Sequence, residues 1–273
     1  MSEEERLVKL MDKYKISNHD LETILKNSKK KPHINSKKID VGSKKFYYAY
    51  FSDSHMGSNS FRPDVYEKML KLINMYKPDF VINVGDTLEG MSNRPGHVYE
   101  LTHIGFNQQF NYAKDLLSQI KIPIYGIDGN HDAWFEMKSD QGIIVGNELD
   151  KAIENYNHLG QMEGDLNIDG INMRLFHAND GTAYATSYKL QKLIESFSGG
   201  EKPNILHSGH YHKSLYMFNR NVHGIESGTL CTQSKFMRGK KIPAHTGFGF
   251  GRVWHDGHGE VKRYNHEFIP FYE

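Results

Sequence analysis

The sequence has one cysteine among 273 residues and no long hydrophobic run. The single thiol of Cys231 cannot form an internal disulfide, which excludes a disulfide-stapled domain and a metal site built from cysteines. No stretch approaches the ~18 consecutive apolar residues of a membrane-spanning helix. The acidic N-terminus, residues 1–5, also lacks the apolar core of a secretory signal. These absences predict a cytoplasmic protein whose metal ligands would be oxygen and nitrogen atoms.

The net charge is also small, because the sequence has 34 Lys and Arg and 33 Asp and Glu, for a total of +1. The total hides an asymmetry along the chain. Residues 1–45 carry 12 basic and 7 acidic side chains, a net of +5, and the remainder carries −4. Eight lysines lie between Lys26 and Lys45, where Asp40 is the one acidic residue. The near-neutral total therefore does not exclude a nucleic-acid partner, since a local basic segment can contact phosphates.

Residues 1–28 predict two short helices. Leu7, Leu10 and Met11 recur at helical spacing, and Ser17 offers an N-cap for a second helix. The pair has the outline of a helix-turn-helix. Followed by the lysine-rich stretch 29–45, which reads as a solvated linker, it could bind a phosphate backbone. The alternative is a helical hairpin that packs against the main domain, and the pattern does not separate the two.

The main domain, residues 46–273, begins with alternating strand and helix patterns. Short apolar or aromatic runs predict strands, and stripes of apolar residues at helical spacing predict helices. The strands are expected at 45–51, 79–84 and 122–127, and the helices at 64–76 and 106–120. The order β-α-β-α-β favours a parallel sheet covered by helices.

The second half of the domain shifts toward hairpins. Asp169-Gly170 between strand patterns at 165–168 and 171–176 is a strong two-residue hairpin signal. A helix is expected at 182–197. Further short strands are expected at 204–207, 215–218, 222–226, 248–254 and 260–268. The prediction is a second, mixed sheet packed on the first.

Polar side chains follow five of the expected strands, where α/β sheets usually hold their sites. Each motif alone is commonplace on a protein surface, but their common placement points to one site. The five motifs are Asp53-Ser54-His55, Gly85-Asp86, Gly129-Asn130-His131-Asp132, His177 and Gly209-His210-Tyr211-His212.

In this order the motifs resemble the pattern of the calcineurin-like metallophosphoesterases. That pattern is Asp-x-His, Gly-Asp, Gly-Asn-His-Asp/Glu, a single His, and Gly-His-x-His. The resemblance spans about residues 46–268. It implies an α/β fold, a four-layer α/β/β/α sandwich with two mixed sheets, here preceded by a small N-terminal helical segment. One departure is Ala178 after His177, where the family often has glycine.

The resemblance implies two divalent metal ions that share Asp86. The first would be held by Asp53, His55, Asp86 and His212, and the second by Asp86, Asn130, His177 and His210. A ligand set of carboxylate, imidazole and amide without thiolate suits Mn²⁺, the expected metal, with iron or zinc as alternatives. Two such ions would clamp a phosphate and activate a water molecule.

The resemblance also implies a catalytic role for His131, as a general acid or charge stabiliser at the leaving group. Glu89 lies three residues after Asp86, the spacing of an acid that orients this histidine in the phosphoprotein-phosphatase branch. We nominate Glu89 as a second catalytic residue, with an ordinary solvated glutamate as the alternative. Asp132 is expected to support a ligand or cap a helix, and His207 to be structural.

The substrate class is the least constrained prediction. A nuclease or phosphodiesterase acting on DNA or RNA is favoured, similar to DNA-repair nuclease subunits and archaeal polymerase small subunits. The basic N-terminus supports it, and residues 85–90 lack the arginine of the phosphoprotein-phosphatase signature. Nucleic acid is therefore the expected partner, and no membrane is. The alternatives are a phosphomonoesterase, a cyclic-nucleotide phosphodiesterase, and a binding subunit without activity, which the complete ligand set argues against.

Overall fold

The computed structural model describes residues 3–22, 34–138 and 142–272 and divides into two compact units, residues 1–34 and 35–273. The first unit contains α1 (Glu3–Tyr14) and the start of a second helix at residue 18. Ser17 caps that helix, because its hydroxyl accepts from the Asp20 backbone N–H at 3.1 Å while the Asp20 carboxylate accepts from the Ser17 N–H at 2.9 Å. The cap agrees with the sequence, and residues 23–28 lie outside the described residues.

The interpretation of 29–45 as a linker needs correction. Residues 29–33 lie outside the described part of the chain, but β1 (Ser36–Ile39) is a strand that pairs in parallel with β6 (Glu163–Ile168). Ile39 packs against the core between the sheets, which explains why the segment is ordered despite its lysines. Lys37 and Lys38 are exposed on an edge strand, where charge discourages further pairing.

The first sheet has six strands in the order β12-β11-β2-β3-β4-β5. Its strands are β2 (Lys45–Phe51), β3 (Phe80–Asn83), β4 (Ile124–Asp128), β5 (Tyr156–Gln161), β11 (Gly247–His255) and β12 (Val261–Pro270). Strands β2 to β5 run parallel, as the β-α-β-α-β pattern predicts, and β11 and β12 are antiparallel. Strand β5 was not expected from the sequence, because its Asn, His and Gly weaken the strand pattern.

The second sheet is also mixed, in the order β1-β6-β7-β8-β10-β9. Its remaining strands are β7 (Ile171–His177), β8 (Ile205–Gly209), β9 (Ser214–Asn219) and β10 (Val222–Ser227). Asp169 and Gly170 join β6 to β7 with φ values of 48° and 90°, both in the left-handed region that a two-residue hairpin turn requires.

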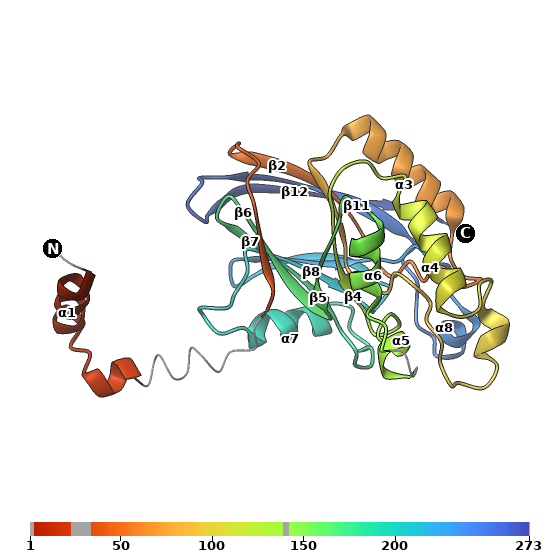
Figure 1. Ribbon diagram of the computed structural model, residues 1–273, viewed down its shortest axis with the longest axis horizontal. Coiled ribbons are helices and arrows are strands. Elements are labelled where there is room, and N and C mark those ends of the chain that lie inside the picture. The colour runs from red at the N-terminus through yellow and green to blue at the C-terminus, as the bar shows by residue number, and fades with distance from the viewer. Residues whose placement is uncertain (1–2, 23–33, 139–141, 273) are drawn as a thin grey trace. The chain divides into compact units, whose positions relative to one another are not determined.

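Helices cover the outer faces of the two sheets, which gives the expected four-layer α/β/β/α sandwich (Figure 1). On the first sheet lie α3 (Pro63–Tyr76), α4 (Phe106–Leu117) and α6 (Val145–Ala152), and on the second lies α7 (Tyr188–Ser196). A hydrophobic core fills the space between the sheets with large side chains such as Tyr48, Phe80 and Met173. Across the described residues, no helix is both long and apolar enough to cross a bilayer.

Helix α7 begins six residues later than the predicted helix 182–197. The preceding loop is tied to the strand ends instead of forming a helical turn. The carbonyl of Asp180 accepts from His210 Nε2 at 2.8 Å, and the carbonyl of Ala183 accepts from Lys213 Nζ at 3.2 Å. Three short helices, η1 (His97–Glu100), α5 (Trp134–Met137) and α8 (Lys235–Gly239), lie in loops near the same strand ends.

Candidate metal centre

The site lies where the carboxyl ends of strands from both sheets meet. Because β2, β3 and β4 are parallel, the loops after them emerge together, and the ends of the parallel pair β7 and β8 face them. Two glycines permit this close approach. A Cβ atom on Gly85 would lie 2.6 Å from His177 Nδ1, and one on Gly209 would lie 2.5 Å from the Val84 carbonyl oxygen.

Most of the predicted ligands have a strained backbone. Five of them adopt positive φ although none is glycine, namely Asp53 (50°), His55 (46°), Asp86 (50°), His210 (88°) and His212 (54°). Such conformations cost about 1–3 kcal/mol each and persist where the surrounding structure imposes them, often at functional sites. Their concentration here indicates that the fold places these side chains at the expense of local stability.

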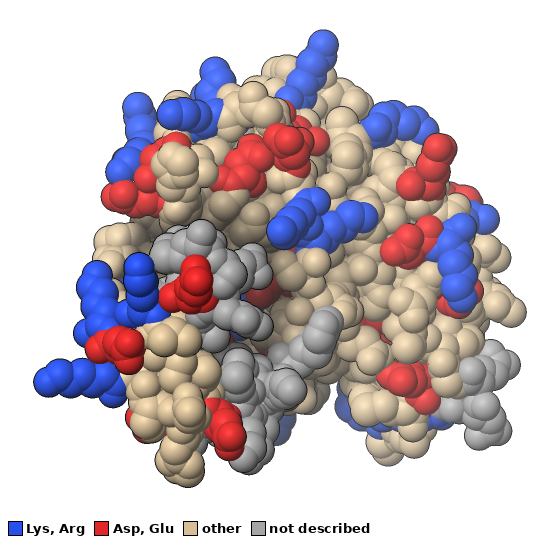
Figure 2. All heavy atoms as spheres, turned by 60° about the vertical axis from the view of Figure 1, so that its left-hand side comes forward, with Lys and Arg blue, Asp and Glu red and all other residues tan. Residues whose placement is uncertain are grey.

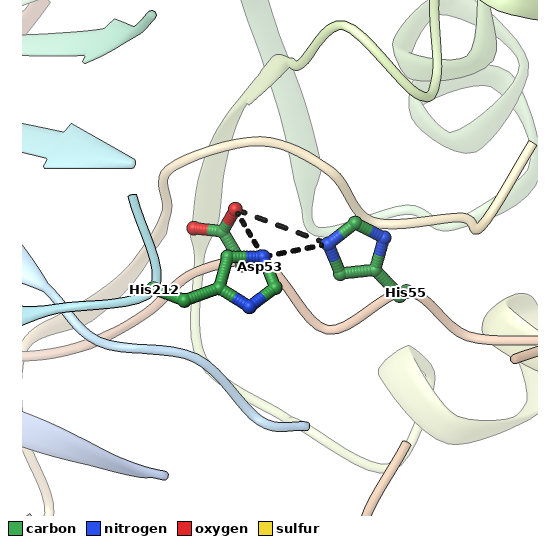
Figure 3. Close-up of side chains that lie close together, drawn as sticks. All are labelled: Asp53, His55 and His212. Carbon is green, nitrogen blue, oxygen red and sulfur yellow. Dashed lines mark hydrogen bonds and ion pairs between the residues drawn. The ribbon is translucent and has the colours of Figure 1, made fainter. Parts of the chain in front are cut away.

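Asp53, His55 and His212 form a first cluster (Figure 3). Their side chains come from the loops after β2 and β8 and point toward one another. The Nε2 atoms of the two histidines lie 3.1 Å apart, and Asp53 Oδ1 lies 3.9 Å from His55 Nε2 and 3.3 Å from His212 Nε2. Asp53 is fully buried, so the structure collects three donor atoms around one point with little solvent.

Asp86, His177 and His210 form a second cluster beside Asn130. His210 Nε2 donates to the Asp180 carbonyl, so the lone pair of the neutral ring is on Nδ1, 2.8 Å from Asn130 Oδ1. In metal-binding histidines, a hydrogen bond from the nitrogen that does not bind the metal fixes the orientation of the ring. All seven predicted ligands therefore lie in one of the two clusters or directly beside it.

Asp86 lies between the two clusters. Its Oδ2 atom is 3.2 Å from His177 Nε2 and 3.7 Å from His55 Nε2, so one carboxylate oxygen faces a histidine of each cluster. Its Oδ1 atom accepts from the backbone N–H of His131 at 2.8 Å. This placement is what a bridging ligand requires.

The donor atoms fit divalent cations. His177 Nδ1 donates to the Val84 carbonyl at 2.7 Å, which leaves the lone pair on the buried Nε2 atom. That atom makes no hydrogen bond with any described residue and faces the Asp86 carboxylate. Two electron-rich atoms so close repel each other unless a cation or a proton lies between them.

Protons compete for the same positions. Although burial lowers it, the negative charge of Asp86 raises the pKa of His177 to about 10. Burial likewise opposes the hydrogen bond and charge of Glu89, which raise the pKa of His55 to about 9. Against the effect of burial, the positive charge of His212 lowers the pKa of Asp53 to about 2. The site therefore favours bound positive charge. Divalent ions can supply this charge while the histidines stay neutral.

Glu89 lies in the site, but its contacts differ from those expected. Its carboxylate contacts His55 Nδ1 at 2.9 Å and His97 Nε2 at 2.8 Å, whereas His131 Nδ1 is 3.8 Å away. His131 Nδ1 donates instead to the backbone carbonyl of Glu89 at 2.8 Å. The carboxylate therefore orients a predicted metal ligand, and the main chain of the same residue orients His131.

His131 lies at the edge of the metal cluster and in the wall of the cleft above it. Its ring centroid is 4.5 Å from that of His55 and 4.0 Å from that of Trp134. Burial lowers the pKa of His131 to about 4. Because Nδ1 is engaged by the Glu89 carbonyl, Nε2 is the nitrogen free to contact a substrate.

Asp132 and His207 have the supporting positions that the sequence predicts. The Asp132 carboxylate accepts backbone N–H groups of Thr87, Leu88 and Gly129 at 2.8 to 3.0 Å, which joins the loops that carry Asp86 and Asn130. His207 is fully buried in β8 and bonds to Tyr48 and Ser227.

The centre opens into a cleft of about 660 Å³. In the loop after Glu89, Arg94 and His97 line the cleft, whereas His103 does not. His97 is buried, and its role toward Glu89 was missed because nothing in the sequence pairs the two residues. The cleft is also lined by Trp134 and by Phe236, for which the sequence carries no motif.

Comparison with known proteins agrees with this geometry. The family model for the calcineurin-like phosphoesterases matches residues 46–238, which include all seven predicted ligands. The chain belongs to the calcineurin-like phosphoesterase family. The resemblance drawn from the five motifs is thus confirmed.

Curated relatives within the calcineurin-like phosphoesterase family are named DNA polymerase II small subunit. The protein of Methanothermobacter thermautotrophicus is 24% identical over 252 residues, 76% of this chain and 51% of its own. That of Archaeoglobus fulgidus is 26% identical over 267 residues, 81% of this chain and 54% of its own. The chain spans about half the length of these relatives. A solved structure, described as a novel archaeal phosphodiesterase, shares 16% identity over 82% of this chain and 99% of its own, with a TM-score of 0.48.

Proposed function

We propose that this protein is a two-metal phosphodiesterase that cleaves DNA or RNA. The observation that carries the proposal is the convergence of the seven donor side chains on two adjacent points, with Asp86 between them. Asp53, His55, Asp86 and His212 would hold one divalent ion, and Asp86, Asn130, His177 and His210 the other. Ions bound there would polarise the phosphate and generate a hydroxide nucleophile from water at neutral pH.

Residues of the chain itself would orient the His131 ring toward the leaving group. The Glu89 carbonyl accepts from His131 Nδ1 and the residue lines the cleft, so Nε2 is the nitrogen left for the substrate. With the ring neutral in the free protein, a bound phosphodiester anion would favour a proton on Nε2, which could then be donated to the departing oxygen. The Trp134 ring packs against the His131 ring, with centroids 4.0 Å apart and the planes tilted by 30°.

Three observations support nucleic acid as the substrate. Curated relatives that are 24% and 26% identical carry the name DNA polymerase II small subunit. The chain has Gly85-Asp86-Thr87-Leu88-Glu89-Gly90 where a phosphoprotein phosphatase would have an arginine after the acid. The first unit, residues 1–34, also contains 8 basic residues, and such a segment would add phosphate affinity. We expect Mn²⁺ as the metal, with iron or zinc as alternatives.

An activity panel with Mn²⁺ tests the proposal. It compares labelled single- and double-stranded DNA, RNA, bis-p-nitrophenyl phosphate and the corresponding mono-ester. We expect cleavage of the bis-ester and of at least one nucleic acid. Cleavage of the mono-ester alone would contradict the proposal and favour a phosphomonoesterase. Cleavage of cyclic nucleotides without cleavage of a polymer would favour the small-molecule phosphodiesterase alternative.

A further inference from the structure

The segment that crosses from β10 to β11 forms part of the cleft wall. We call residues 228–246, which include α8, the α8 arm. Both ends of the arm are attached to the metal centre: the Thr229 hydroxyl donates to the Asp53 carbonyl at 2.7 Å, and the His245 N–H donates to the His212 carbonyl at 2.8 Å. The arm is therefore held at a fixed place beside two predicted ligands.

The middle of the arm enters the cleft. Ser234 caps α8, because its hydroxyl accepts from the Met237 N–H at 3.2 Å, and the buried Met237 anchors the short helix. Ser234, Phe236, Met237 and Ile242 line the same cleft as His131 and His212. Figure 1 shows α8 and α5 on the same side of the second unit. A substrate that reaches the metal centre through this cleft passes the arm.

Phe236 is an aromatic side chain left open to that cleft. Its side chain is 47% exposed, although it lies in a concave wall rather than on an outer surface. The guanidinium of Arg94 lies 5.4 Å from the centre of the Phe236 ring, and Arg94 is itself held by a bidentate contact with Glu100. A ring supported in this way is a platform on which a planar group can stack.

The arm is also strongly basic. Between Gly228 and Thr246 there is no acidic residue, whereas four cations surround Phe236 in the sequence. These are Lys235, Arg238, Lys240 and Lys241. All four are exposed, and within the part of the chain that the structure describes none makes an ion pair. By contrast, Figure 2 shows basic and acidic side chains interspersed over the face it presents.

We infer that the α8 arm is a binding wall for single-stranded nucleic acid, in which Phe236 stacks on a base and the four cations contact the flanking phosphates. Open aromatic rings interleaved with unpaired cations are the elements by which proteins hold single strands without reading sequence. In a duplex the bases are already stacked on their neighbours, so Phe236 favours an unpaired strand. The inference rests on the proposed function, since it places the polymer substrate in the cleft of the metal centre.

Binding of a labelled 20-nucleotide single strand, measured by fluorescence anisotropy on the full chain with Ca²⁺ to suppress cleavage, tests the inference. Phe236→Ala is expected to weaken binding by about 5- to 150-fold, the effect of one lost base stack, and Phe236→Trp to restore it. The matched control is Phe218→Ala, which removes an exposed aromatic on β9 away from the cleft and should leave binding unchanged.

The charged part of the wall has its own measurement. Lys240→Gln with Lys241→Gln should reduce the slope of log affinity against log salt by about 1.4, since each phosphate contact to a single strand contributes about 0.7. The control pair, Lys68→Gln with Lys71→Gln, removes two charges from exposed positions on α3. It should change the slope less than the Lys240→Gln and Lys241→Gln pair does. Hydrolysis of bis-p-nitrophenyl phosphate should be unchanged in the control variants Phe218→Ala and Lys68→Gln with Lys71→Gln, whose residues do not line the cleft.

Several outcomes would overturn the inference. The first is that the wild-type chain does not bind single strands. The second is that Phe236→Ala binds them as tightly as the wild-type chain does. The third is that Phe236→Ala weakens single-strand and duplex binding equally. Tight binding that depends on Phe236 but is never followed by cleavage with Mn²⁺ would support the binding wall and contradict the proposed nuclease activity. The two failures are thus distinguishable.

Discussion

At the scale of single residues, Glu89 holds two histidines that the sequence does not connect. Its buried carboxylate contacts His55 on one oxygen and His97 on the other. Although burial opposes ionisation, the hydrogen bonds from His55 and His97 lower the pKa of Glu89 well below its usual range. The residue therefore remains an anion that fixes the ring of a predicted metal ligand.

Glu89→Gln is expected to lower the affinity for Mn²⁺ by about 10- to 100-fold, the usual effect of losing the partner of a metal-binding histidine. The amide keeps the shape of the side chain but loses the charge that orients His55. The measurement is activity against the bis-ester as a function of Mn²⁺ concentration. Glu100→Gln is the control, because Glu100 lines the same cleft but pairs with Arg94. A variant with unchanged Mn²⁺ affinity and reduced kcat would instead make Glu89 part of the catalytic step.

His131→Asn is expected to retain the metal ions and to lose about 10²- to 10⁴-fold in kcat, the usual contribution of a general acid or base. His131 is not one of the seven predicted ligands and adjoins them through the ring of His55, so its removal should leave all seven donors in place. Metal content by elemental analysis and kcat against the bis-ester are measured together. Loss of metal from this variant would show that His131 supports the ligands rather than the reaction.

The five motifs were sufficient to predict which side chains would meet, because each motif pairs a polar residue with the end of a strand. The contacts between them were not predictable. His97 lies eight positions from Glu89 in a loop without a regular pattern, and its burial depends on the fold of η1. Phe236 was equally hidden, since a single aromatic residue in an irregular segment resembles any surface phenylalanine.

At the scale of elements, strong periodic patterns were predicted well and weak ones were not. Helix α3 and strands β2, β3 and β4 lie within a few residues of their expected positions, because buried elements need continuous apolar patterns. The late start of α7 and the pairing of β1 depend instead on distant contacts. Strand β1 has only Ile39 to pack inward, and its lysines gave the pattern of a linker.

Two truncations test the role of β1. Deletion of residues 1–34 is expected to leave the stability of the second unit unchanged, because that unit begins at residue 35. Deletion of residues 1–44 also removes β1 and the side chains of Ile39 and Val41, which pack against the core between the sheets. It should cost about 1–3 kcal/mol of unfolding free energy, measured by urea denaturation. Equal stability of both truncations would return residues 35–44 to the status of a linker.

At the scale of the whole molecule, acidic and basic side chains gather in different regions. The second unit concentrates buried acids at the metal centre, where Asp53 and Asp86 are almost inaccessible to solvent. Its exposed cations include the unpaired set on the α8 arm. The net charge of +1 is the sum of these separate features and says little about the partner. Whether the first unit binds DNA as a helix-turn-helix stays a prediction.

The metal centre should therefore contribute to the stability of the whole fold. Five predicted ligands hold strained backbone conformations, and buried carboxylates face histidine lone pairs, so the folded state gains more from a bound cation than the unfolded chain does. Mn²⁺ at 100 times its Kd should raise the free energy of unfolding by about 2.7 kcal/mol for each site, and EDTA should remove this gain together with activity. Thermal denaturation with and without Mn²⁺ measures it.

Asp86→Asn should abolish the Mn²⁺ dependence because Asp86 serves both clusters, whereas Asp115→Asn on α4 should preserve it. A Mn²⁺-dependent rise that persists in Asp86→Asn would show that the two sites do not share this carboxylate.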